Sequence, residues 1–183
     1  MVRMRAVVVD AEWELERRRE LGIDKKDELW DGEWHFVNPP KVCHQRLNFD
    51  MAHVLGPIAR QIGLEPLNDA GVIADITKNF RVPDQVYARP EQLTEDGAAT
   101  AELVVEVRSP GDESHLKLPF YAERGVSEVL IVHQDRRFEL YRLGATGEYE
   151  AVEGGRSNVL DVTFSTVDGP KLHLSWEGGA AEV

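Results

Sequence analysis

The segment ELVVEVRSPGDESHLKL, residues 102–118, carries the pattern that decides the fold. Its first seven residues are mostly apolar and β-branched, which predicts a core β-strand whose side chains alternate between two faces. Positions 103, 105 and 107 share one face, and Glu106 and Arg108 share the other. A carboxylate inside a core strand is unfavourable unless it meets a cation, a metal or hydrogen-bond donors. We therefore expect Glu106 to have such a partner, and Lys117, just past the next turn, is a candidate.

The segments around this strand predict a mixed α/β fold in a single domain, residues 1–183, with a core over about 12–176 and mobile termini. An N-terminal helix begins after Asp10, and Asp31-Gly32 is a strong hairpin signal. Apolar residues at helical spacing predict the best helix of the chain over 43–63. The expected helices are 11–21, 43–63 and 116–124, and the expected strands are 28–30, 33–37, 71–76, 85–88, 102–108, 128–133, 137–143, 158–165 and 172–176. The tail from 177 to 183 is expected to be mobile.

Composition limits the class of protein. Hydrophobic residues make up 42% of the 183 residues and charged residues 30%, which is typical of a globular domain. The single cysteine, Cys43, excludes an internal disulfide and a metal site built from cysteines. No apolar run is long enough to cross a membrane or to resemble a signal peptide, so we expect a cytoplasmic protein without a membrane partner.

The formal net charge of −12 bears on any nucleic-acid partner. Proteins that bind nucleic acids neutralise phosphates and usually carry a basic face. A phosphate-bearing partner of this chain would therefore have to meet a locally basic patch or a bound metal ion.

A second carboxylate occurs in NFRVPDQVY, residues 79–87, where Asp84 directly follows a proline at the start of a short strand. If that strand pairs beside the core strand, Asp84 and Glu106 converge. Two carboxylates with water suit Mg²⁺ or Mn²⁺. A nearby lysine would orient or help to deprotonate a water on the metal and would stabilise charge on a phosphoryl group. His44, at the start of the long helix, is a candidate to line the same cleft, and Glu33 is a candidate further acidic ligand.

VPD (82–84), LVVEVRSP (103–110) and KLPFYAERGVSEVLIV (117–132) together resemble a family of bacterial proteins, the putative restriction endonucleases, within the PD-(D/E)xK nuclease superfamily. DELWDGEWHFVNPP (27–40) and the dipeptide His44-Gln45 also resemble the N-terminal half of that family, so the resemblance spans about 12–176. It implies a restriction-endonuclease-like fold, with a four-stranded mixed core sheet flanked by helices, and metal-dependent hydrolysis of a phosphodiester.

The resemblance also implies roles for particular residues. Asp84 and Glu106 match the metal-binding acids, and Lys117 matches a catalytic lysine that has migrated to the next helix. The superfamily pattern expects the lysine two residues after Glu106, where this chain has Arg108. Arginine stays protonated and is a poor base. We therefore expect Asp84, Glu106 and Lys117 to be catalytic, and Arg108 and His44 to contact phosphate.

Simpler interpretations stay open for each residue. Asp84 could cap a turn, Glu106 could form a structural ion pair with Arg108 or Lys117, and Lys117 could be solvated. Three functions follow: a metal-dependent endonuclease acting on DNA, an inactive nuclease-fold protein with a binding or regulatory role, or a phosphodiesterase acting on a small nucleotide or a repair intermediate. The inactive alternative predicts that Lys117 points away from the carboxylates. A homodimer is also expected, because two cuts in a duplex need two sites.

Overall fold

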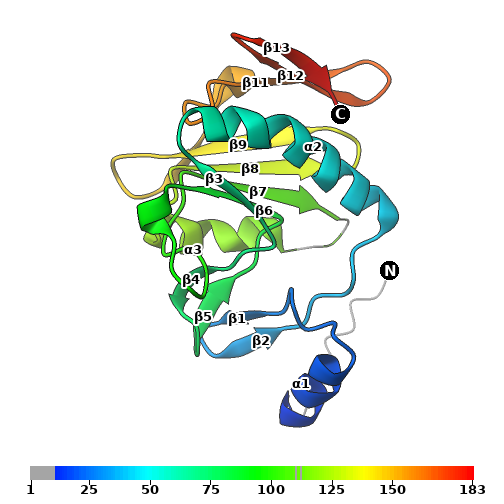
Figure 1. The fold of residues 1–183 in the computed structure, drawn as a ribbon, viewed down its shortest axis with the longest axis vertical. Coiled ribbons are helices and arrows are strands. Elements are labelled where there is room, and N and C mark those ends of the chain that lie inside the picture. Colours follow the sequence, from blue (N-terminus) through cyan, green and yellow to red (C-terminus); the bar gives the residue numbers. More distant parts are fainter. Residues whose placement is uncertain (1–10, 110, 112) are drawn as a thin grey trace.

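The computed structural model describes residues 11–109, 111 and 113–183, so the predicted helix cap Asp10 lies outside the described residues. Within this range the strands form a six-stranded, a four-stranded and a three-stranded sheet (Figure 1). The helices are α1 (Ala11–Glu20), α2 (Val42–Gln61) and α3 (Leu118–Glu123), with 3₁₀ turns η1 (Pro90–Gln92), η2 (Ser114–Lys117) and η3 (Glu153–Gly155). The strands are β1 (Glu28–Trp30), β2 (Glu33–His35), β3 (Glu65–Asn68), β4 (Val72–Asp75), β5 (Asn79–Arg81), β6 (Gln85–Ala88), β7 (Leu103–Arg108), β8 (Glu128–His133), β9 (Phe138–Leu143), β10 (Tyr149–Ala151), β11 (Thr163–Val167), β12 (Lys171–Trp176) and β13 (Gly179–Glu182).

The six-stranded sheet has the order β10-β9-β8-β7-β6-β3. Strands β7 and β8 are parallel, and the other pairs are antiparallel, so the predicted mixed sheet is confirmed. The four central strands correspond to the core that the resemblance implies, and β3 and β10 extend it at the two edges. Because parallel neighbours need a crossover, the chain leaves β7, forms η2 and α3, and returns to β8. Lys117 lies on this crossover.

The two faces of the sheet have different covers (Figure 1). Leu103, Val105 and Val107 pack with apolar residues of α2, β11 and β12. On the opposite face, Val104 packs with Phe120 of α3. The predicted alternation along β7 is therefore confirmed, and Glu106 belongs to the face that α3 covers.

The four-stranded sheet, with the order β2-β1-β5-β4, lies beside the site. Arg81 of β5 fixes it in place, because its guanidinium lies 4.3 Å from the ring centroid of Trp30 and 4.2 Å from that of Phe120. The same side chain donates to the main-chain oxygen of Leu29. Arg81 thus ties the β1–β2 hairpin to α3.

Several details differ from the expectations. The strand expected over 158–165 is β11, which begins only at Thr163, and β3, β5 and β10 were not expected. The predicted helix 116–124 is divided into η2 and α3, with Pro119 in the first turn of α3. The segment 177–183 was expected to be mobile, but it forms β13, which pairs with β12. Val183 also exchanges two main-chain hydrogen bonds with Leu172, both 2.9 Å long.

No helix within the described residues is long and apolar enough to cross a membrane.

Candidate active site

Asp84 lies beside the carboxyl end of β7. Strand β6 pairs antiparallel with β7, with Gln85 opposite Val105. Asp84 therefore lies next to Val107, whose main-chain N–H donates to its Oδ2 atom at 2.8 Å. The predicted pairing of the two strands is confirmed, and it brings Asp84 close to Glu106.

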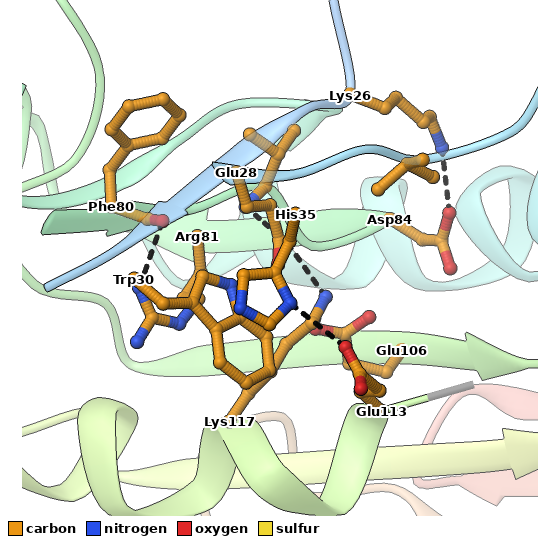
Figure 2. Close-up of polar contacts among 12 residues, drawn as sticks. Lys26, Glu28, Trp30, His35, Phe80, Arg81, Asp84, Glu106, Glu113 and Lys117 are labelled. Atoms are coloured by element: carbon orange, nitrogen blue, oxygen red, sulfur yellow. Dashed lines mark hydrogen bonds and ion pairs between the residues drawn. The ribbon is translucent and has the colours of Figure 1, made fainter. Parts of the chain in front are cut away.

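Two side chains from distant segments contact the other oxygen of Asp84. Lys26 Nζ lies 2.8 Å and His44 Nε2 2.9 Å from Oδ1 (Figure 2 shows the lysine contact). Lys26 also lies 2.7 Å from Oδ1 of Asp69. Burial raises the pKa of Asp84, but the hydrogen bond from His44 and the charge of Lys26 outweigh burial and lower this pKa to about 2. Asp84 therefore stays ionised at neutral pH.

Glu106 has different surroundings. Its Oε1 atom accepts from Lys117 Nζ at 3.0 Å and from the Tyr121 hydroxyl at 2.7 Å. Burial raises the pKa of Glu106. Lys117 opposes this effect, whereas the charges of Asp84 and Glu28 add to it, so that the pKa lies at about 7. Glu106 thus has too little positive charge nearby to stay fully ionised at neutral pH.

Lys117 is shared between two carboxylates. Its Nζ atom lies 2.8 Å from Glu28 Oε1 in addition to its contact with Glu106 (Figure 2). Burial lowers the pKa of Lys117, but the charges of Glu106 and Glu28 outweigh burial, so the pKa lies above its ordinary value. Lys117 is therefore a fixed cation and not a base.

Glu28 is an acid that the sequence analysis missed. It lies on β1, where it also accepts from the main-chain N–H of Val82 and from Trp30 Nε1, both at 2.8 Å. The candidate from this hairpin was Glu33, which is exposed on β2. Glu28 and Trp30 are two residues apart on one strand, so their side chains point to the same face. This spacing is the sequence signal that could have identified Glu28 as a candidate.

Lys26 and Tyr121 were missed as well. Tyr121 follows Lys117 by four residues, the spacing that places two side chains on the same face of a helix. Lys26 lies in a loop before β1, and no pattern in the sequence predicts its contact with Asp84.

The two residues expected to contact phosphate lie on either side of Glu106. His44 reaches the site from α2, and its Nδ1 atom lies 3.4 Å from the hydroxyl of Ser109, just after β7. Arg108 is half-buried at the end of β7, and its charge acts on Tyr141 of β9. The structure thus brings Asp84, Glu106, Lys117 and His44 together, and places Arg108 at the side of the site toward β9.

The comparisons with known proteins identify the family and the fold. The model of a family described as "Putative restriction endonuclease" matches residues 13–170. The chain belongs to this family. It is also similar to a solved structure described as a putative nuclease belonging to DUF820, from Anabaena variabilis, with a TM-score of 0.57 and 14% sequence identity over 72% of this chain and 78% of that chain. The search of curated proteins found no match. The fold is restriction-endonuclease-like, as the resemblance implied.

The charges in this restriction-endonuclease-like site are unbalanced. Lys26 is shared by Asp69 and Asp84, and Lys117 by Glu28 and Glu106, so four carboxylates face two lysines. A divalent cation would offset this excess and would lower the raised pKa of Glu106. Among the described residues, no group of three or more His, Cys, Asp or Glu side chains converges on one metal position. Asp84 and Glu106 supply carboxylate oxygens, the type of ligand that Mg²⁺ takes, and Mg²⁺ often binds through only one or two carboxylates because it keeps several waters.

Proposed function

We propose that this protein is a metal-dependent endonuclease that hydrolyses phosphodiester bonds in DNA. The observation that carries the proposal is the contact between Lys117 and Glu106, which is 3.0 Å long. It lies at the carboxyl end of β7, beside which Asp84 also lies. Lys117 follows Glu106 by eleven residues and lies on the crossover after β7. It thus contacts the residue that the family pattern expects to be a metal-binding acid. Membership of a family of putative restriction endonucleases supports the same proposal.

The side chains of the site have separate roles in this proposal. Asp84 and Glu106 would hold Mg²⁺ or Mn²⁺, which when bound supplies a Lewis acid that stabilises charge on the phosphoryl group. Lys117 keeps its proton, orients Glu106 and adds a positive charge where negative charge develops on the phosphate. His44 and Arg108 would contact phosphates of the substrate.

The inactive alternative has less support, because it expected Lys117 to point away from the carboxylates. Instead Lys117 contacts both Glu28 and Glu106. A cytoplasmic location and a homodimer stay predictions.

The test begins with a calorimetric titration of Mn²⁺ into the wild type and into the double variant Asp84→Ala, Glu106→Ala. The same samples are then incubated with plasmid and with short oligonucleotides. We expect metal binding and metal-dependent cleavage in the wild type and loss of both in the double variant. Glu33→Ala, which removes an exposed acid of the hairpin, is the control and should behave as the wild type.

The outcomes separate the alternatives. Metal binding without cleavage of any DNA would contradict the proposed substrate and would support the small-nucleotide alternative once small phosphodiesters are hydrolysed. Absence of metal binding would support the inactive alternative, with Glu106 and Lys117 as a buried ion pair.

A further inference from the structure

A second cluster of ionisable side chains lies beside the site, at the same end of the sheet. Glu139 of β9 is at its centre. His115 Nε2 of η2 lies 2.8 Å from its Oε2 atom, and His133 Nε2 of β8 lies 2.6 Å from its Oε1 atom. The Tyr141 hydroxyl donates to Oε2 at 2.6 Å. We call these four residues the histidine cluster.

The sheet register connects this cluster to the proposed cleavage site. Glu106 of β7 is opposite Ile131 of β8, and Ile131 is opposite Glu139 of β9. Side chains in register on neighbouring strands point to the same face, so Glu106 and Glu139 share the face that α3 covers. Their Cα atoms are separated by two strand spacings, about 10 Å. The cluster therefore lies on the same face of the sheet as Glu106, two strands away from it.

The crossover between β7 and β8 also links the proposed cleavage site to the histidine cluster. His115 precedes Lys117 by two residues in η2, so one short segment delivers a residue to each. Arg108, on β7, is in register with His133, and its charge acts on Tyr141. Arg108 and His133 thus lie side by side at the ends of β7 and β8, and Arg108 is close enough to Tyr141 for its charge to act on it.

The cluster is accessible to solvent. The side chains of His115 and Glu139 are 35% and 34% exposed, and that of His133 is 15% exposed. Lys117, by comparison, is only 12% exposed. A ligand can therefore reach the imidazoles without displacing the core.

Glu139 fixes the orientation of both imidazoles. Burial raises the pKa of Glu139, but hydrogen bonds from Tyr141, His115 and His133 outweigh burial and lower this pKa to about 2. An ionised carboxylate only accepts hydrogen bonds, so each imidazole donates through Nε2 and directs Nδ1 away from Glu139. The two imidazoles contact different oxygens of Glu139, and the described side chains do not converge on a metal position. When an imidazole is protonated, its Nδ1 atom also carries a hydrogen and can donate to an anion.

The charges of the site give a reason for a phosphate to bind at the histidine cluster. Each lysine of the site is already shared by two carboxylates, and a divalent cation would no more than offset the excess of acid. A nucleic-acid strand brings further phosphates next to the one that is cleaved. The positive charge for them has to come from side chains nearby, and Arg108 together with protonated His115 and His133 can supply it.

We propose that Arg108, His115 and His133, with the two imidazoles held by Glu139, form a subsite for a backbone phosphate of a nucleic-acid strand, adjacent to the phosphate that is cleaved. This proposal rests on the proposed function, whose site it extends. With Nε2 donating to Glu139, Nδ1 can donate to a phosphate only when the imidazole is protonated, so we expect binding at the subsite to be stronger at pH 6 than at pH 8.5. The charged and titratable groups that face the imidazoles are Glu139, Tyr141 and Arg108, and Asp135, on which the charge of His133 acts.

The first test follows the imidazole signals of the metal-free protein by nuclear magnetic resonance at pH 6 while dimethyl phosphate, a phosphodiester that cannot reach across two sites, is added. We expect saturable shifts at His115 and His133. His53, exposed on α2, and His173, on β12, are internal controls and should not shift. Shifts at His115 and His133 no larger than those at the two controls would overturn the proposal.

The second test measures binding of a non-cleavable phosphorothioate oligonucleotide at pH 6 and pH 8.5. At pH 6, His115→Gln and His133→Gln should each weaken binding about tenfold, which corresponds to about 1.4 kcal/mol. Each should also reduce the slope of log K against log[salt] by about one. At pH 8.5 the variants should match the wild type. His53→Gln is the matched control. If His133→Gln does not fold, the result for His115→Gln, at the more exposed position, tests the subsite by itself.

The two proposals fail in different ways. Cleavage without any effect of the histidine variants on oligonucleotide binding would overturn the subsite and leave the nuclease proposal intact. Shifts of His115 and His133 by dimethyl phosphate in a protein that cleaves no DNA would support the subsite and contradict the proposed substrate.

Discussion

Asp84 and Glu106 are both buried carboxylates at the same end of two neighbouring strands, yet their pKa values are displaced in opposite directions. Asp84 accepts from a histidine, a lysine and a main-chain N–H, and its pKa falls to about 2. Glu106 accepts from Tyr121 and from a lysine that it shares with Glu28, and its pKa rises to about 7. Burial raises the pKa of both groups, so the neighbours, and not burial, decide which carboxylate is ionised.

This difference has a chemical consequence. Each half has two carboxylates around one lysine, but Asp84 also accepts from His44 and the N–H of Val107, and its neighbour Asp69 is 43% exposed, whereas both Glu28 and Glu106 are buried. A divalent cation therefore gains more by approaching Glu106. In the proposed function, Asp84 would be the preformed, ionised ligand, and Glu106 the ligand whose charge state responds to the metal.

Removal of the shared lysine should have the largest effect. Lys117→Met leaves Glu28 and Glu106 facing each other without their cation, and breaking a buried ion pair from one side typically costs about 3–5 kcal/mol. We expect a loss of this size in the free energy of unfolding, measured with urea near pH 7, and a loss of cleavage of about 10²–10³-fold. Lys41→Met, at an exposed position before α2, is the control and should cost little. A stability equal to the wild type would mean that Lys117 does not hold the two carboxylates.

The pH dependence of stability should distinguish the two carboxylates. The folded-state pKa of Glu106 is raised to about 7, so its contribution is present below the unfolded value and is lost as the pH rises from about 4.5 to 7, by about 3 kcal/mol. The folded-state pKa of Asp84 is lowered to about 2, so its contribution is present above about pH 4 and is lost as the pH falls toward 2. Metal-free protein is unfolded with urea across pH 2–8.

A variant of each carboxylate should remove the pH dependence from one side of the plot of unfolding free energy against pH. Glu106→Gln should remove the fall between pH 4.5 and 7, and Asp84→Asn should remove the rise between pH 2 and 4. Glu33→Gln, at an exposed position, should change neither side. If both variants changed the curve in the same range, the two carboxylates would share one environment and the comparison would be wrong.

Removal of the lysine on the Asp84 side should have a smaller effect than Lys117→Met. In Lys26→Met, Asp84 keeps His44 and the N–H of Val107, and Asp69 is 43% exposed and can be solvated. The loss in unfolding free energy should therefore be about 1–3 kcal/mol, the usual range for a hydrogen bond to a charged group. The acid side of the stability curve should also move to higher pH, because the pKa of Asp84 rises without Lys26. A loss as large as that of Lys117→Met would show that the two halves depend equally on their lysines.

The sequence predicted the parts of the site that depend on local pattern and pairing. Alternation along residues 102–108 placed Glu106 on one face, and the short strand after Asp84 pairs with it as expected. The assignment of Lys117 came from the family resemblance, because no local pattern fixes a contact across eleven residues. The hairpin was predicted within two residues of its observed end, but its orientation, which brings Glu28 to Lys117, depends on tertiary packing around Arg81.

The short edge strands were harder to predict. Strand β3 contains Pro66, and β10 and β13 have few β-branched residues, so pairing with a neighbour and not propensity makes them strands. The histidine cluster shows the same limit. His115, His133 and Glu139 are separated in the sequence, and only the crossover and the sheet register bring them together.

The smallest expected effect concerns the hydroxyl group on the Glu106 side. Tyr121→Phe removes the 2.7 Å hydrogen bond to Glu106 and should cost about 1–2 kcal/mol. That hydrogen bond lowers the pKa of Glu106, so its loss should raise this pKa further, and the fall of stability with pH should continue to a higher pH than in the wild type. Tyr149→Phe is the matched control, because its hydroxyl donates at the same distance to the main-chain oxygen of Val126, which does not titrate. We expect both variants to lose a similar free energy of unfolding at pH 4. Only Tyr121→Phe should change the pH at which the free energy of unfolding stops falling. An unchanged end point in Tyr121→Phe would mean that Lys117 alone, without the hydroxyl, sets the charge state of Glu106.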